Sequence, residues 1–133
     1  MKATALLTAA LLLISVIPAR SSGDTPISVL VANSVTPSPD KTYSTFVVFR
    51  GILLGGLTRL QASNQGFSFT YSLDQNYGPF LQSVNGLSGS TEERTYWQLK
   101  VKKPNNSTII PDVGIGCYIP AANDQIILNY TKF

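Results

Sequence analysis

The chain has 133 residues, of which 44% are hydrophobic and 13% are charged, and it carries a formal net charge of +3. This length provides for one domain with its own hydrophobic core, and the composition excludes a disordered chain. Without residues 1–22, which contain Lys2 and Arg20, the net charge falls to +1, so neither nucleic acid nor an anionic membrane is expected as a partner.

The sequence contains no histidine and one cysteine, Cys117. A Ser/His/Asp or Cys/His nucleophile and a zinc site built from His and Cys are therefore excluded. The adjacent Glu92 and Glu93 point to opposite sides of an extended chain, so they do not form the paired acids of a glycosidase. We expect a protein that is not an enzyme, with no catalytic residues, no catalytic cofactor and no metal site.

The first 22 residues have the three parts of an export signal. Lys2 precedes a largely apolar stretch over residues 3–17, and small residues follow over residues 18–23. The apolar stretch is too short to span a bilayer comfortably, and no second stretch of sufficient length follows it. The sequence therefore predicts a signal peptide at residues 1–22, a mature domain at residues 23–133 and a secreted, extracellular protein.

The first predicted elements of the mature chain are two strands and a helix. β-branched residues favour a strand over residues 27–31, and after a Pro-rich loop a second strand is expected over residues 42–49. These two strands are expected to pair antiparallel. Residues 51–62 place Leu53, Leu57 and Leu60 at helical spacing, which predicts one short helix.

The rest of the chain alternates between apolar and polar residues. Residues 67–73 put four apolar side chains on one face, and residues 80–84 lead into Asn85-Gly86, a strong hairpin signal. Residues 94–103 place Trp97, Leu99 and Val101 on one side, with Lys100, Lys102 and Lys103 expected at a solvated sheet edge. The last patterned segments are residues 114–119 and 125–130. The fold class expected is mainly β: an antiparallel β-sandwich or curled sheet with one short α-helix.

An exported protein is exposed to two kinds of covalent modification, N-glycosylation and disulfide formation. Asn-x-Ser/Thr triplets begin at Asn105, Asn106 and Asn129, which predicts a glycoprotein. Cys117 has no partner within the chain, so either it is buried as a small hydrophobic residue or it forms an intermolecular disulfide.

The mature sequence resembles the C-terminal β-domain of the cobalamin carriers, the family of intrinsic factor, transcobalamin and haptocorrin. The residues that carry the resemblance are, in order, 67–73 (FSFTYSL), 77–80 (YGPF), 83–87 (SVNGL), 95–99 (TYWQL), 114–120 (GIGCYIP) and 126–130 (IILNY). The resemblance implies a secreted module that binds and transports cobalamin or a related corrinoid. In the family this β-domain covers one side of the corrin, and a separate α-helical barrel domain holds the other.

The resemblance also implies which residues contact the ligand. Carried over by position, the contacts fall on two segments and on one of two isoleucines: Asn76, Tyr77, Gly78, Pro79, Phe80 and Leu81; Trp97, Gln98 and Leu99; and Ile109 or Ile110. A corrin is a broad apolar disc fringed with amides, so aromatic and aliphatic surface beside a tight turn suits it. On residue pattern alone, Trp97 and Leu99 can equally be ordinary core residues, and the turn can be a hairpin without a ligand.

The chain departs from the family pattern in three ways. It lacks the helical barrel, so a helical-barrel partner protein, a receptor or a second copy is considered as the second wall. The connection between Trp97 and Gly114 is longer than in the family, and Cys117 stands where the family has an acidic residue. Two alternative functions are kept: a secreted protein-interaction module that lost the ligand, and a lectin in which Trp97 or Tyr77 stacks on a sugar.

Overall fold

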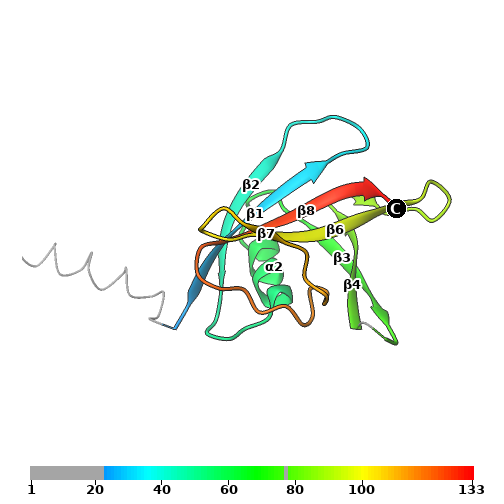
Figure 1. Ribbon diagram of the computed structural model, residues 1–133. Coiled ribbons are helices and arrows are strands. Elements are labelled where there is room, and N and C mark those ends of the chain that lie inside the picture. Colours follow the sequence, from blue (N-terminus) through cyan, green and yellow to red (C-terminus); the bar gives the residue numbers. More distant parts are fainter. Residues whose placement is uncertain (1–22, 77) are drawn as a thin grey trace, which may run out of the picture.

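The computed structural model describes residues 23–76 and 78–133, so the predicted signal peptide at residues 1–22 and Tyr77 lie outside the described residues. Within this part the chain forms two β-sheets and one helix, which confirms the predicted fold class (Figure 1). The larger sheet has the strand order β2-β1-β8-β6-β7 and the smaller one β3-β4-β5. Their bounds are β1 Thr25–Asn33, β2 Lys41–Val47, β3 Phe69–Asp74, β4 Gly78–Val84, β5 Leu87–Ser88, β6 Thr95–Lys102, β7 Thr108–Ile109 and β8 Asp124–Lys132, and the helix α2 is Leu53–Ala62.

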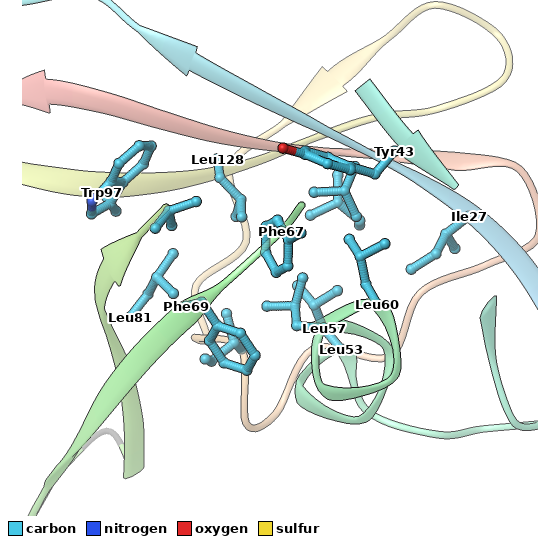
Figure 2. Close-up of a cluster of buried hydrophobic side chains, with 14 of the residues drawn as sticks. Ile27, Tyr43, Leu53, Leu57, Leu60, Phe67, Phe69, Leu81, Trp97 and Leu128 are labelled. Atoms are coloured by element: carbon cyan, nitrogen blue, oxygen red, sulfur yellow. The ribbon is translucent and has the colours of Figure 1, made fainter. Parts of the chain in front are cut away.

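The two sheets and the helix form two layers. Figure 1 shows α2 and the smaller sheet side by side beneath the same face of the larger sheet. The core between the layers includes Leu53, Leu57 and Leu60 of α2 together with Phe67, and Figure 2 shows these side chains below Tyr43 of the larger sheet. The predicted leucine stripe is therefore the buried face of the helix.

The pairing of the larger sheet is antiparallel except at its centre. β1 pairs antiparallel with β2 as predicted, and β8 pairs antiparallel with β6. β1 and β8 are parallel, with Ile27 opposite Asp124 and Asn33 opposite Tyr130. The local pattern of neither strand indicated this parallel pair, because it joins opposite ends of the described chain.

A glycine allows α2 to approach the larger sheet closely. A Cβ at Gly56 would lie 2.8 Å from Cγ1 of Val47 on β2, which is closer than carbon atoms pack. Gly55, one residue earlier, has open space around its Cα. Packing therefore explains one of the two glycines that weaken this helix intrinsically.

The β3–β4 ribbon extends beyond the core. The rings of Phe67, Phe69 and Tyr71 follow one another on one face of residues 67–73, as predicted, but only the first half of that face is covered. Phe67 and Phe69 are buried, whereas Tyr71 is 45% and Leu73 is 79% exposed. The alternation identified the strand, but it did not show where the opposite layer ends.

Two segments near the C-terminal end differ from the pattern. Residues 114–119 form a turn rather than a strand, with Gly114 O accepting hydrogen bonds from the N–H groups of Cys117 and Tyr118. The short strand β7 was not predicted.

The predicted Asn85-Gly86 hairpin is confirmed between β4 and β5, with both residues at positive φ (50° and 86°).

Candidate functional site

A groove of about 210 Å³ lies between β4, the open edge of β6 and the loop that follows β7. Its lining residues are Phe80, Leu81, Tyr96, Trp97, Gln98, Leu99, Ile110, Pro111, Gly114 and Ile115. The fold thus brings together six residues that the resemblance implied as ligand contacts, and these come from three separate segments: Phe80, Leu81, Trp97, Gln98, Leu99 and Ile110. Of the two isoleucines considered, Ile110 lines the groove and Ile109 does not.

The turn between β3 and β4 lies outside the groove lining. Asn76 donates its backbone N–H to Oδ1 of Asp74 at 2.8 Å, and Gly78 takes a positive φ of 71°. Gly78 and Pro79 begin β4 without lining the groove, and neither does Asn76. These three residues are therefore placed at the end of the hairpin and not in the groove itself.

Trp97 is mainly a core residue. It is 6% exposed, its ring centroid lies 5.1 Å from that of Tyr130, and its Nε1–H donates to Leu87 O at 2.8 Å. These two contacts join it to β8 and β5, and neither involves α2. A ring buried to this extent has no open face on which a sugar could stack. Trp97 is therefore not the stacking residue that the lectin alternative requires.

The backbone of β6 is open along the groove. Thr95 exchanges both backbone hydrogen bonds with Ser90 on the side away from β8, and Arg94 O accepts from Phe133 N on the opposite side. Since these directions alternate along a strand, the N–H and C=O groups of Trp97 and Leu99 also point away from β8. On that side β7 pairs only from Val101 onward, so within the described chain Trp97 and Leu99 have a strand neighbour on the β8 side and none on the groove side.

The far wall of the groove is a turn fixed to the helix. α2 has no side-chain cap, and its first N–H groups instead donate to the loop: Leu53 N to Tyr118 O at 2.8 Å and Leu54 N to Ile115 O at 2.9 Å. Backbone carbonyls thus satisfy donors that are otherwise left open at a helix N-terminus. The contact holds Gly114 and Ile115 against the groove. The Gly-Ile motif of the resemblance was the available signal for these two lining residues.

Close packing joins this wall to β4. A Cβ at Gly116 would lie 2.6 Å from Cδ of Pro79, so Gly116→Ala forces the turn and β4 apart. We expect it to lower the free energy of unfolding by about 1–3 kcal/mol, measured by urea denaturation. Gly55→Ala is the matched control, because its Cβ meets nothing within 4 Å and should stabilise the helix by about 0.5–1 kcal/mol. Equal effects of the two substitutions would contradict the packing described.

One buried carboxylate ties the same loop to the larger sheet. Asp124 is 0% exposed, and its Oδ1 and Oδ2 lie 2.8 and 3.0 Å from Nζ of Lys103. Oδ2 also accepts from the hydroxyl of Tyr118 at 3.0 Å and the N–H of Ala121 at 2.9 Å. Lys103 was expected at a solvated edge. That expectation is wrong, because the β6–β7 turn brings its ammonium group to Asp124.

The Asp124 cluster changes two proton affinities. The hydrogen bond to the Asp124 carboxylate, supported by its charge, holds the pKa of Lys103 above its usual value. Burial raises the pKa of Tyr118, and the hydrogen bond to Asp124 raises it further. Both groups therefore keep their protons more firmly in the folded chain than in the unfolded one.

The predicted modification sites have different surroundings. Cys117 is exposed, so the expectation of a buried thiol is wrong, while an intermolecular disulfide stays a prediction. Asn105 and Asn106 are exposed in the turn between β6 and β7, where Asn105 Oδ1 accepts from the hydroxyl of Ser107 at 2.7 Å. Asn129 is 8% exposed in the central strand β8, and its Oδ1 accepts from Ser34 Oγ. A glycan is attached through Nδ2, and at Asn129 this atom belongs to a buried side chain that offers little room for a sugar.

Two further properties concern the described residues alone. Residues 23–76 and 78–133 contain no group of three or more His, Cys, Asp or Glu side chains placed to hold a metal ion. In the same part of the chain no helix has both the length and the apolar character needed to cross a membrane.

Fold and groove together define a small two-layer β-domain with a groove beside an open strand edge. The chain belongs to the family described as a domain of unknown function (DUF4430), whose model matches residues 53–132. It is also similar to the cobalamin binding intrinsic factor of the dog, Canis lupus familiaris. The two are 31% identical over 83 residues, which are 62% of this chain and 18% of that protein.

Two solved structures have a similar fold. Haptocorrin in complex with Cbi superposes with a TM-score of 0.69 at 18% identity, over 83% of this chain and 25% of haptocorrin. A putative metal binding protein from Ruminococcus gnavus ATCC 29149 gives a TM-score of 0.54 at 11% identity, over 82% of this chain and 98% of the other. The chain thus spans about a quarter or less of the two cobalamin-related proteins. Its homology to the β-domain of the cobalamin carriers is confirmed.

Proposed function

We propose that the chain is a secreted module that binds and transports a corrinoid, and that the groove beside β6 receives the edge of this ligand. The observation that supports the proposal most is the convergence of Phe80, Leu99 and Ile110 on one groove. These residues come from distant parts of the sequence; the family resemblance implies Phe80 and Leu99 as ligand contacts, and Ile110 as one of two candidates.

The chemistry of the groove suits such a ligand. Phe80 is 49% and Ile110 is 61% exposed, so apolar side chains offer surface to the face or rim of a corrin ring. The open N–H and C=O groups of Leu99 and Trp97 offer a donor and an acceptor each to the amides around the ring. Gln98 on β6 points its side chain to the other face of the sheet, so it contributes to the groove through its backbone.

The size of the groove limits what this chain does alone. Its volume of about 210 Å³ lies below the roughly 300–1,000 Å³ of sites that enclose small ligands. Only one edge of a corrinoid fits, and a second surface is required to cover the rest. We propose a helical-barrel partner protein, a receptor or a second copy of the chain for this role. Because the sequence has no histidine, the chain supplies no imidazole to the cobalt, and the ligand keeps its own axial groups.

A titration tests the proposal. The purified protein is titrated with cobalamin and with a corrinoid lacking the lower nucleotide, followed by calorimetry and by the fluorescence of the single tryptophan, Trp97. Saturable binding is expected, and Phe80→Ala should weaken it about fivefold or more, since truncation removes an apolar contact. Phe49→Ala is the matched control, because Phe49 is 65% exposed in the loop before α2 and does not line the groove.

A protein-interaction module is the second candidate function. It is favoured by Tyr71 and Leu73, which expose apolar surface on the β3–β4 ribbon outside the groove lining. Absence of corrinoid binding in both the reduced and the Cys117-oxidised protein would support this candidate. Equal loss of binding in the Phe80 and Phe49 variants would contradict the assigned groove.

A further inference from the structure

A second cleft, of about 310 Å³, opens on the other side of Trp97. It lies between the loop joining β1 to β2 and the β4–β5 hairpin. Its lining residues are Val31, Ala32, Asn33, Ser38, Pro39, Lys41, Val84, Asn85, Leu87 and Trp97. Apart from Trp97, this cleft shares no lining residue with the groove beside β6, so it is a separate candidate site.

The floor of the second cleft is apolar. Val31, Val84, Leu87 and Trp97 come from four different strands, β1, β4, β5 and β6. Val84 and Trp97 belong to the buried core, while Leu87 is 37% exposed. The open part of this floor offers contact to a small aliphatic or aromatic group that leaves water.

The polar groups of the second cleft are mainly donors. Lys41 is its one charged lining residue among those described, and no carboxylate lines it; Asp40, the preceding residue, does not. Asn33 Oδ1 already accepts from the N–H groups of Val35 and Thr36 at 2.9 Å each, so Asn33 presents its N–H donors. The Asn85 side chain is already engaged, because its Oδ1 accepts from the N–H of Ser68 and its Nδ2 donates to the hydroxyl of Tyr43. The Ser38 hydroxyl is a further polar group of the lining.

We propose that the second cleft binds a small free carboxylate with an apolar chain. The chain of the ligand lies on Leu87 and Val31, and the carboxylate faces Lys41 with the Asn33 amide beside it. The charge of the lining determines this choice, since an ammonium ligand would meet Lys41 without a carboxylate partner. A volume near the lower limit of small-molecule sites requires a ligand of modest length.

Decanoate and its uncharged analogue decanol are the probes for this proposal. Decanoate is titrated into the purified protein by calorimetry, with Trp97 fluorescence as a second signal. We expect saturable decanoate binding that Lys41→Gln weakens about tenfold, because the carboxylate loses a charged hydrogen bond. Decanol should bind more weakly than decanoate, and Lys41→Gln should leave its affinity unchanged.

Two control variants distinguish binding in this cleft from a general effect of lysine charge and from binding in the corrinoid groove. Lys102→Gln removes an exposed lysine of β6 that does not line the cleft, and it should leave decanoate binding unchanged. Phe80→Ala, which acts in the other groove, should also leave it unchanged. The proposal is overturned by absent saturation, by equal losses in the two lysine variants, or by displacement of decanoate by a corrinoid in competition. Each of these results leaves the Phe80 test of the corrinoid groove independent.

Discussion

Truncation of Trp97 to alanine is expected to lower the free energy of unfolding by about 3–5 kcal/mol. The side chain is 6% exposed, packs against Tyr130 and donates a hydrogen bond to Leu87 O at 2.8 Å. Its loss leaves a cavity between the layers and an unpaired carbonyl. The measurement is urea denaturation followed by far-ultraviolet circular dichroism, since the variant lacks tryptophan fluorescence.

Phe80→Ala serves as the control for the Trp97 result. Phe80 is 49% exposed, and its truncation should cost less than about 1 kcal/mol. A cost for Trp97→Ala as small as that for Phe80→Ala would contradict the core position of the indole. This difference also decides how binding is tested: loss of corrinoid binding in Trp97→Ala would report unfolding, whereas loss in Phe80→Ala reports the groove.

Removal of the buried carboxylate is the second change with a large expected effect. Asp124→Ala should lower the free energy of unfolding by about 3–5 kcal/mol, because Lys103, Tyr118 and the Ala121 N–H all lose their acceptor. Urea denaturation of Asp124→Ala, Lys103→Met and the double variant gives the coupling energy of the pair. Additive effects in this cycle would show that the ion pair contributes nothing of its own.

The same cluster predicts the response of the protein to alkaline pH. The pKa values of Lys103 and Tyr118 are both raised on folding, so the folded chain binds these protons more tightly. Their contribution to stability is present below the usual values of 10.5 and 10.0 and is lost as the pH rises above them. Denaturation curves between pH 8 and about 11 should show the decline in the wild type and a smaller one in Asp124→Ala. An equal decline in both proteins would remove Asp124 as its cause.

Local patterns in the sequence were sufficient to predict most elements. Strand alternation identified β6, and the leucine spacing identified α2 to within two residues of its start. The Asn85-Gly86 turn was predictable because its positive φ angles depend on these two residues alone. Contacts between distant segments were not predictable, since no local pattern records the parallel β1–β8 pair or the burial of Asp124.

The same distinction applies to the residues of the candidate site: those within a sequence motif were predictable, and those placed by contacts between distant segments were not. Phe80 and Leu99 were predicted from positions that match a family motif, and both line the groove. Gly114 and Ile115 were missed, because their place in the groove depends on carbonyls that bind the N-terminus of α2 from a loop sixty residues away in sequence. The distinction between Ile109 and Ile110 required the end of β7 to be known, since Ile109 still pairs with Val101 in the sheet whereas Ile110 follows the strand and lines the groove.

The parallel pair at the centre of the larger sheet limits how early that sheet can be completed. The β3–β4–β5 hairpins close over short loops and are available early during synthesis, whereas β1 has only its edge neighbour β2 until β8 is complete. A nascent chain on the ribosome therefore keeps one edge of β1 open through almost the whole of translation. The larger sheet is completed only after β8 has been synthesised, and until then β1 carries the kind of unpaired strand edge at which other chains add.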